Sequence, residues 1–282
     1  MTFAITSRRG LLAGALSLAV TPSAFAAEAV ADATVAIPVQ GREVSLSLWK
    51  PASPKGVILF SHGAGSWPWR YHELLSQWRD AGFLVIAPLH MDSQKHPNRQ
   101  TDLKAALGLR VADMVVAGSY ADRAAPGLPR GAAGHSYGAL GVMIMGGALE
   151  TMIPARDKQV KAVVAISSPG VIPGLIAPNA YQSLAVPSLT ITGDADVVPH
   201  FVTDPKDHLR AFETAPADDR YAMVVKGGTH DLIGLDFASH PATAGAAALS
   251  TEFLKAEILG DAAATAALKA RKSDELAEFR VR

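Results

Sequence analysis

The chain contains no cysteine among its 282 residues. This absence excludes disulfides, a thiol nucleophile and a lipid-modified cysteine anchor. Charge is also scarce: 18% of the residues are charged, and 26 basic residues balance 26 acidic ones. A near-neutral surface gives no reason to expect nucleic acid or an anionic membrane as a partner. Because 49% of the residues are hydrophobic, one sizeable core can supply the stability.

The N-terminus lacks an apolar run long enough for a membrane span. Arg8 and Arg9 precede an apolar stretch that ends at Val20, about half of the ~20 residues that a spanning helix needs. Ala24-Phe25-Ala26 follows as a small-x-small cleavage site, so residues 1–26 are typical of a secretory signal. The paired arginines resemble a bacterial twin-arginine signal, and a general secretory signal is the alternative. We expect a mature protein with a net charge of −2, periplasmic or secreted, with no membrane span.

Apolar runs alternate with helical patterns along the rest of the chain. Strands are predicted near 34–37, 44–48, 56–60, 83–87, 132–133, 160–166, 188–192 and 221–225, and helices near 69–80, 102–117, 137–149, 206–212 and 241–259. This alternation predicts an α/β fold with a mostly parallel central sheet and helices on both faces. The domain is expected to span 27–260 without a large cap domain, and 261–282 to form a surface helix or a frayed end.

A candidate nucleophile lies between a short strand and a helix. Gly134-His135-Ser136-Tyr137-Gly138 fits G-x-S-x-G, in which a tight strand-to-helix turn presents the serine at the edge of the sheet. The glycines leave room for the strained backbone, and the start of the helix favours developing negative charge. The alternative is an ordinary glycine-rich turn before a buried helix.

A serine hydroxyl needs a base and an orienting acid, which follow a G-x-S-x-G serine in the order acid, then histidine. His230 is the favoured base because it follows a strand that ends at Val225; a loop histidine that packs near the last helix is the alternative. His208 lies among charges in a predicted helix, which favours a solvated surface role. His200 and His240 each adjoin a proline and remain weaker candidates for the base. Two candidate acids, Asp194 and Asp196, follow the strand 188–192.

The loop after the strand 56–60 is the candidate second half of an oxyanion site. It reads Ser61-His62-Gly63-Ala64-Gly65, and its glycines let the backbone approach a substrate closely. We expect the backbone N–H groups of Ala64 and Tyr137 to stabilise the oxyanion, and His62 to order the loop. The loop lacks the glycine spacings of phosphate-binding motifs. Trp67 and Trp69 follow as candidate pocket residues, either an aromatic wall for an acyl or aryl group or anchors for the next helix.

Taken together, the segments around His62, GHSYG, GDAD and GGTH resemble the α/β-hydrolase superfamily over nearly all of the mature length. The resemblance is greatest to dienelactone-hydrolase-like and platelet-activating-factor-acetylhydrolase-like esterases. The family pattern of a glycine followed three places later by the acid implies Asp196 rather than Asp194, which would instead form a turn. True dienelactone hydrolases use a cysteine nucleophile, so Ser136 argues against a lactone substrate. Dehalogenases and epoxide hydrolases place an aspartate at this elbow, which disfavours those reactions.

These residues predict carboxylic-ester hydrolysis through an acyl-enzyme on Ser136, with His230 as base and Asp196 as acid. The expected substrate is a small molecule or an acyl ester, and no metal or organic cofactor is required. No histidine pair shows metal-ligand spacing such as H-E-x-x-H. Two alternatives remain: an acyltransferase or peptidase with the same triad, and a non-catalytic binding protein that keeps the fold.

Overall fold

The computed structural model describes residues 31–39, 41–172, 174, 176–216, 218–232 and 241–282. The predicted signal segment 1–26 and His240 lie outside the described residues.

Within these ranges, nine strands form one sheet in the order β1-β2-β4-β3-β5-β6-β7-β8-β9. The strands are β1 (Ala33–Val39), β2 (Arg42–Trp49), β3 (Gly56–Ser61), β4 (Phe83–Pro88), β5 (Arg130–His135), β6 (Val160–Ile166), β7 (Ser188–Gly193), β8 (Arg220–Val225) and β9 (Ala277–Val281). The six strands from β4 to β8 in this order run parallel, whereas β1, β2 and β9 pair antiparallel. The prediction of a mostly parallel sheet is therefore confirmed.

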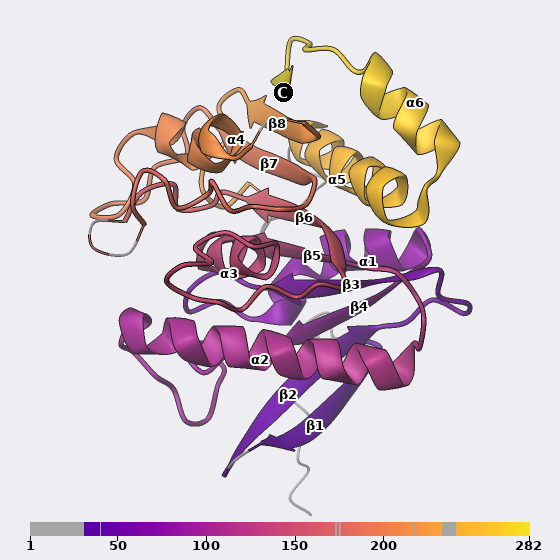
Figure 1. Cartoon of the computed structure of the whole chain (residues 1–282), viewed down its shortest axis with the longest axis vertical. Coiled ribbons are helices and arrows are strands. Elements are labelled where there is room, and N and C mark those ends of the chain that lie inside the picture. Colours follow the sequence, from indigo (N-terminus) through magenta and orange to yellow (C-terminus); the bar gives the residue numbers. More distant parts are fainter. Residues whose placement is uncertain (1–30, 40, 173, 175, 217, 233–240) are drawn as a thin grey trace, which may run out of the picture.

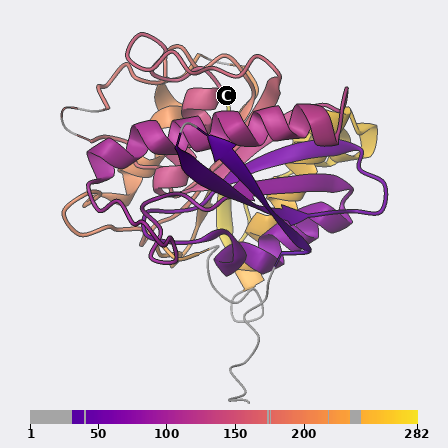
Figure 2. The same cartoon turned by 90° about the horizontal axis from the view of Figure 1, so that it is seen from below.

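Helices cover both faces of the sheet, as Figures 1 and 2 show. They are η1 (Pro68–Tyr71), α1 (His72–Asp80), α2 (Leu103–Ala124), α3 (Tyr137–Met145), η2 (Pro205–Leu209), α4 (Arg210–Thr214), α5 (Pro241–Leu259) and α6 (Ala262–Ala270). Trp78 of α1 and Phe253 of α5 pack on one face, and Met114 of α2 and Leu140 of α3 pack on the other. Buried β3 and β4 lie between the two apolar layers, which is why their sequences read as continuous apolar runs.

The parallel strands all end at the left-hand edge of the molecule in Figure 1, where their following loops gather. Ligand sites of open α/β sheets lie at this carboxyl edge. A cavity of about 420 Å³ lies against Pro187 and Arg220, where β7 and β8 begin. It is therefore at the amino ends of the strands, remote from the carboxyl edge. The candidate site is therefore sought among the loops that follow β3, β5, β7 and β8.

The C-terminal residues differ in part from the expectation of a surface helix or a frayed end. The short helix α6 agrees with it, but β9 extends the sheet along β8. Ala277 is buried, and the ring of Phe279 stacks on that of Tyr221 with centroids 6.2 Å apart. Among the described residues, no helix combines the length and apolar character that a membrane crossing requires.

Candidate active site

Ser136 occupies a sharp turn between β5 and α3. Its φ of 53° and ψ of −122° are unusual for any residue other than glycine, and such strain is typical of functional turns. A Cβ at Gly138 would lie 2.0 Å from the carbonyl oxygen of Ser61, and one at Gly134 would lie 2.5 Å from that of Gly138. Close packing therefore requires both glycines of the motif: Gly138 lies against the end of β3, and Gly134 lies against the backbone of Gly138 across the turn.

The three predicted triad residues meet at this turn. The Ser136 Oγ lies 2.9 Å from His230 Nε2, and His230 Nδ1 lies 2.8 Å from Asp196 Oδ1. The Thr192 hydroxyl donates to the other carboxylate oxygen at 2.8 Å. Because the carboxylate can only accept, Nδ1 carries the proton and Nε2 is free to accept from the serine hydroxyl. The arrangement can therefore move a proton from Ser136 to His230.

Close backbone packing brings the acid and histidine loops together. A Cβ at Gly193 would lie 2.0 Å from the carbonyl oxygen of Gly228, and the Ala195 N–H donates to that same oxygen at 3.0 Å. Asp194 is exposed, and its carboxylate accepts the Gly227 N–H at 2.6 Å. Asp194 thus joins the two loops, whereas the sequence suggested a turn-former that bonds its own backbone.

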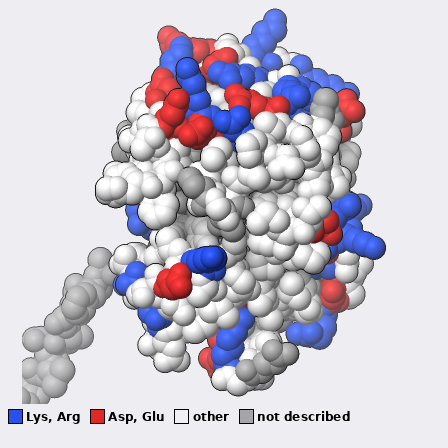
Figure 3. Space-filling view, turned by 60° about the vertical axis from the view of Figure 1, so that its left-hand side comes forward, with Lys and Arg blue, Asp and Glu red and all other residues white. Residues whose placement is uncertain are grey.

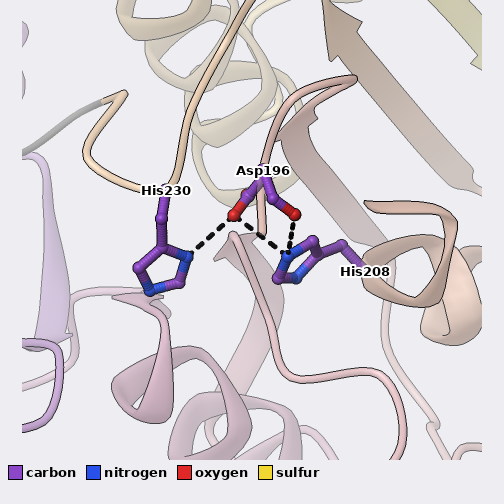
Figure 4. A group of neighbouring side chains, drawn as sticks. All are labelled: Asp196, His208 and His230. Atoms are coloured by element: carbon purple, nitrogen blue, oxygen red, sulfur yellow. Dashed lines mark hydrogen bonds and ion pairs between the residues drawn. The ribbon is translucent and has the colours of Figure 1, made fainter. Parts of the chain in front are cut away.

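The prediction of a solvated surface role for His208 is wrong. Its side chain is fully buried, and its Nε2 lies 3.0 Å from Asp196 Oδ1 (Figure 4). The short helical segment η2 does lie among charges, but it turns this one ring inward against the loop after β7. His200, by contrast, is exposed.

The electrostatics around Asp196 favour its ionised form. Burial by itself raises the pKa of this carboxyl, but hydrogen bonds from His208 and His230 hold it well below the usual range. Ligand atoms of these three residues lie within 4.8 Å of one another, so the group could also be read as a metal site. Ligands of a tetrahedral zinc lie about 3.3 Å apart, given zinc–nitrogen distances of about 2.0–2.1 Å. The contacts of 2.8 and 3.0 Å are instead those of direct hydrogen bonds.

The loop after β3 presents one free amide toward the site. The N–H groups of Gly63, Gly65 and Ser66 donate to Tyr71 Oη, Asp92 Oδ2 and the Gly63 carbonyl, respectively. Within residues 63–66, that leaves the Ala64 N–H without an acceptor. A Cβ at Gly63 would lie 3.4 Å from the Ser136 Cβ, so this loop lies directly against the nucleophile. Tyr137 begins α3, where the first N–H groups have no partner within the helix.

A buried ion pair between Arg110 and Asp92, which was not predicted from the sequence, anchors the loop after β3. Arg110 Nε and Nη2 each lie 2.8 Å from one oxygen of Asp92. The same guanidinium donates to the carbonyl oxygens of His62 at 2.6 Å and Gly63 at 3.0 Å. Although burial raises the pKa of Asp92, the bonds to Arg110 lower it to about 2. The pair therefore contributes stability above the ordinary carboxyl pKa and loses it as the pH falls toward about 2.

Replacing Arg110 by leucine is expected to lower the free energy of unfolding by roughly 3–5 kcal/mol, because it leaves Asp92 as an unpaired buried charge. Denaturant unfolding measures this change. Exposed Arg123 lies on the same helix, and Arg123→Leu should change the free energy by less than about 0.5 kcal/mol. Adding Asp92→Leu to Arg110→Leu should recover part of the loss. Equal stability of the two single arginine variants would contradict the role of Arg110.

A chain of hydrogen bonds also links the loop after β3 to His230. His135 Nε2 lies 2.8 Å from the His230 carbonyl oxygen, so this nitrogen must donate. His135 Nδ1 then accepts from the Tyr71 hydroxyl at 2.9 Å, and that oxygen accepts from the Gly63 N–H. Burial and the neighbouring His230 lower the pKa of His135 to about 4, so its ring is neutral at neutral pH. The series fixes the backbone of His230 relative to Ser136.

The outer rim of the site carries two tryptophans, one of which lies beside cationic side chains. Trp67 is half-buried, and its ring lies 4.9 Å from Lys95 Nζ and 6.0 Å from Arg70 Cζ. Trp69 is also half-buried, within η1. Figure 3 turns the carboxyl edge of the sheet toward the reader: charged side chains gather at the top, and the described residues in the middle of the face are mostly uncharged apart from a basic side chain beside an acidic one.

Comparison with known proteins agrees with this architecture. The chain matches no protein-family model. A monoacylglycerol lipase of Mycolicibacterium smegmatis is 26% identical over 185 residues, which cover 60% of this chain and 63% of the lipase, less than two thirds of its length. The structure of a dienelactone hydrolase from Anabaena variabilis superposes with a TM-score of 0.60, at 22% identity over 80% of this chain and 97% of that one.

A cold-adapted esterase from an Arctic intertidal metagenomic library superposes with a TM-score of 0.54, at 16% identity over 80% of this chain and 92% of that one. At these sequence identities the superpositions are evidence for the fold alone. This chain therefore has the fold of these structures, an α/β sheet covered by helices on both faces like that of the dienelactone hydrolase.

Proposed function

We propose that this protein is a serine hydrolase that cleaves carboxylic esters through an acyl-enzyme. The observation that carries the proposal is the pair of contacts at 2.9 and 2.8 Å that join Ser136, His230 and Asp196. Ser136 Oγ attacks the ester carbonyl carbon while its proton passes to His230 Nε2. Asp196 accepts the Nδ1–H bond and stabilises the imidazolium that forms.

The tetrahedral intermediate places a negative charge on the former carbonyl oxygen, which accepts hydrogen bonds from the N–H groups of Ala64 and Tyr137. The intermediate collapses as His230 gives its proton to the leaving alcohol oxygen, and the acyl group stays on Ser136. A water molecule then attacks the acyl-enzyme and gives a proton to His230. The carboxylic acid leaves, and the proton returns to Ser136 Oγ.

An ester of a neutral acyl or aryl group is the favoured substrate class. The names of the relatives support an ester: one is a monoacylglycerol lipase and another an esterase. The mostly uncharged described residues in the middle of the face in Figure 3 support an uncharged substituent, although the cations Lys95 and Arg70 lie beside Trp67. Half-buried Trp67 and Trp69 are the candidates to contact that substituent.

The proposal includes export of the protein to the periplasm or the medium. N-terminal sequencing of the mature protein would check it by testing for a cut after Ala26.

A fluorophosphonate probe tests the proposed nucleophile. The probe phosphonylates serines that an adjacent base activates, so it should label the folded protein at Ser136, as peptide mapping would show. Heat-denatured protein is the control and should remain unlabelled. Labelling should be accompanied by hydrolysis of p-nitrophenyl esters, and a series of acyl lengths would define the preferred chain. A folded protein that the probe leaves unlabelled would instead be a binding protein with a hydrolase fold.

A further inference from the structure

The buried ring of His208 lies against two backbone carbonyl groups. Its Nδ1 is 2.7 Å from the carbonyl oxygen of Ser168, and its Nε2 is 3.1 Å from the carbonyl oxygen of Asp196. The same Nε2 is 3.0 Å from the Asp196 carboxylate. Figure 4 shows Asp196 between the imidazoles of His208 and His230.

Carbonyl oxygens accept hydrogen bonds and cannot donate them. Each ring nitrogen of His208 must therefore carry a hydrogen; otherwise a nitrogen lone pair would face an oxygen lone pair in a buried site. Both requirements are met together in the imidazolium form alone. The charge then has a partner, because the Asp196 carboxylate lies within hydrogen-bond distance.

Other histidines near the site have one donor and one acceptor contact. The backbone N–H of His90 donates to His62 Nε2 at 3.1 Å. Because Nε2 accepts, His62 Nδ1 is the nitrogen that carries the hydrogen, and it donates to the Gly63 carbonyl oxygen. His135 is likewise neutral, with Nε2 donating and Nδ1 accepting from Tyr71. In His230, Nδ1 faces a carboxylate and Nε2 faces a hydroxyl that can donate. His208 thus differs from all three in its hydrogen-bond geometry.

We propose that His208 is a positioning residue, held as an imidazolium at neutral pH, that fixes the Asp196 carboxylate and extends the action of His230 to lower pH. This inference rests on the proposed function, because it assigns His208 an effect on that reaction. The rings of His208 and His230 are 6.0 Å apart and 28° from parallel. A cation at this distance repels a second cation, so the charge of His208 bears on the work of His230 as a base.

The charges around His208 support this assignment. Among the described residues, Asp196 faces the ring from the loop after β7, and His230 faces it from the loop after β8. On its own segment, Asp207 pairs with Arg210 at 3.7 Å, and both side chains are about one-third exposed. Burial alone would lower the pKa of His208, but the bonds to Asp196 and Ser168 raise it overall.

The protonation state can be measured directly in the wild-type protein. Nitrogen-15 NMR of the histidine rings at about pH 7.5, one unit above the ordinary imidazole pKa of ~6.5, distinguishes an imidazolium from either neutral tautomer. The His208 ring should show two protonated nitrogens, whereas His62 and His135 should each show one. Signals that disappear in His208→Gln identify the residue. A neutral His208 ring at this pH would overturn the proposal, and the readout does not depend on turnover.

The effect on the base is measured by the pH profile of kcat/KM. In His208→Gln, which removes the charge, the acid limb should move to higher pH by roughly 0.5–2 units, the range for a unit charge about 6 Å away in surroundings between water and a protein surface. His208→Lys keeps a charge and three donors, so its acid limb should stay near that of the wild type. An unmoved acid limb in His208→Gln would show that His208 supports structure alone.

These outcomes separate the inference from the proposed function. Failure of the fluorophosphonate probe to label the wild-type protein would reject the serine hydrolase, whatever the state of His208. A labelled, active protein with a neutral His208 ring would reject the inference and leave the hydrolase intact. If His208→Gln does not fold, the signals that disappear in His208→Lys identify the ring, and the nitrogen NMR of the wild type decides.

Discussion

Ser136→Ala is expected to lower the turnover of a p-nitrophenyl ester by about 10⁴-fold or more, because it removes the atom that forms the acyl-enzyme. The fold should persist, since Ser136 is half-buried and makes its side-chain hydrogen bond to His230. Steady-state rates with an active-site titration measure the loss. Circular dichroism and thermal unfolding verify that the variant remains folded.

The chain offers a matched control for this substitution. Ser76 Oγ lies 3.3 Å from His72 Nε2, so it is also a serine beside a histidine. On its other side, however, His72 Nδ1 receives the Trp49 indole N–H at 3.2 Å and contacts no carboxylate there. Ser76→Ala should therefore retain full turnover. Wild-type rates in Ser136→Ala, or a comparable loss in Ser76→Ala, would contradict the assignment of the nucleophile.

Asp196→Asn is expected to reduce kcat by about 10⁴-fold. The neutral amide no longer stabilises a cationic His230, and its NH₂ group can donate toward Nδ1 and favour the wrong tautomer. The same change leaves the buried cation that we assign to His208 without its anion. We therefore expect a lower melting temperature as well as a slower reaction, and thermal unfolding alongside kinetics separates the two losses.

Asp194→Asn is the matched control, two residues away on the same loop. Its carboxylate is exposed and accepts the Gly227 N–H, a bond that the asparagine oxygen can also accept. Its activity should stay within a few-fold of the wild type. The opposite ranking of the two variants would move the acid of the triad to Asp194.

Local patterns were sufficient to predict most of the architecture. Buried strand β4 consists of apolar residues alone, and β3 does so up to its last residue, Ser61. The helix α5 has the predicted bounds because Pro241 suits a first helical turn. The candidate site was also accessible from the sequence, since the residues that meet there stand in motifs at the ends of strands. Glycines in these motifs reflect backbone contacts that any side chain would block.

The supporting residues could not be predicted in the same way. His208 and its charged neighbours read as a solvated helix, and only the packing of η2 against the loop after β7 shows that the ring turns inward. Arg110 carried a weak signal, an arginine within the otherwise apolar stretch 105–112 of a helix. Its partner Asp92 lies in a distant loop, so the pairing depends on tertiary structure. In β9, the alternation of Ala277, Phe279 and Val281 was a usable strand signal.

The position of β9 has a consequence for the solubility of the protein. Its backbone pairs with β8 from Val225 to Tyr221, and beyond it Arg220 and Arg282 exchange two hydrogen bonds. β8 thereby offers no free hydrogen-bonding edge to a neighbouring molecule. A chain shortened before Ala277 would expose that edge, and exposed strand edges are templates for intermolecular pairing. Residues 277–281 thus replace the edge of β8 with that of a short outer strand that carries Glu278 and Arg280, far from the loops that hold Ser136.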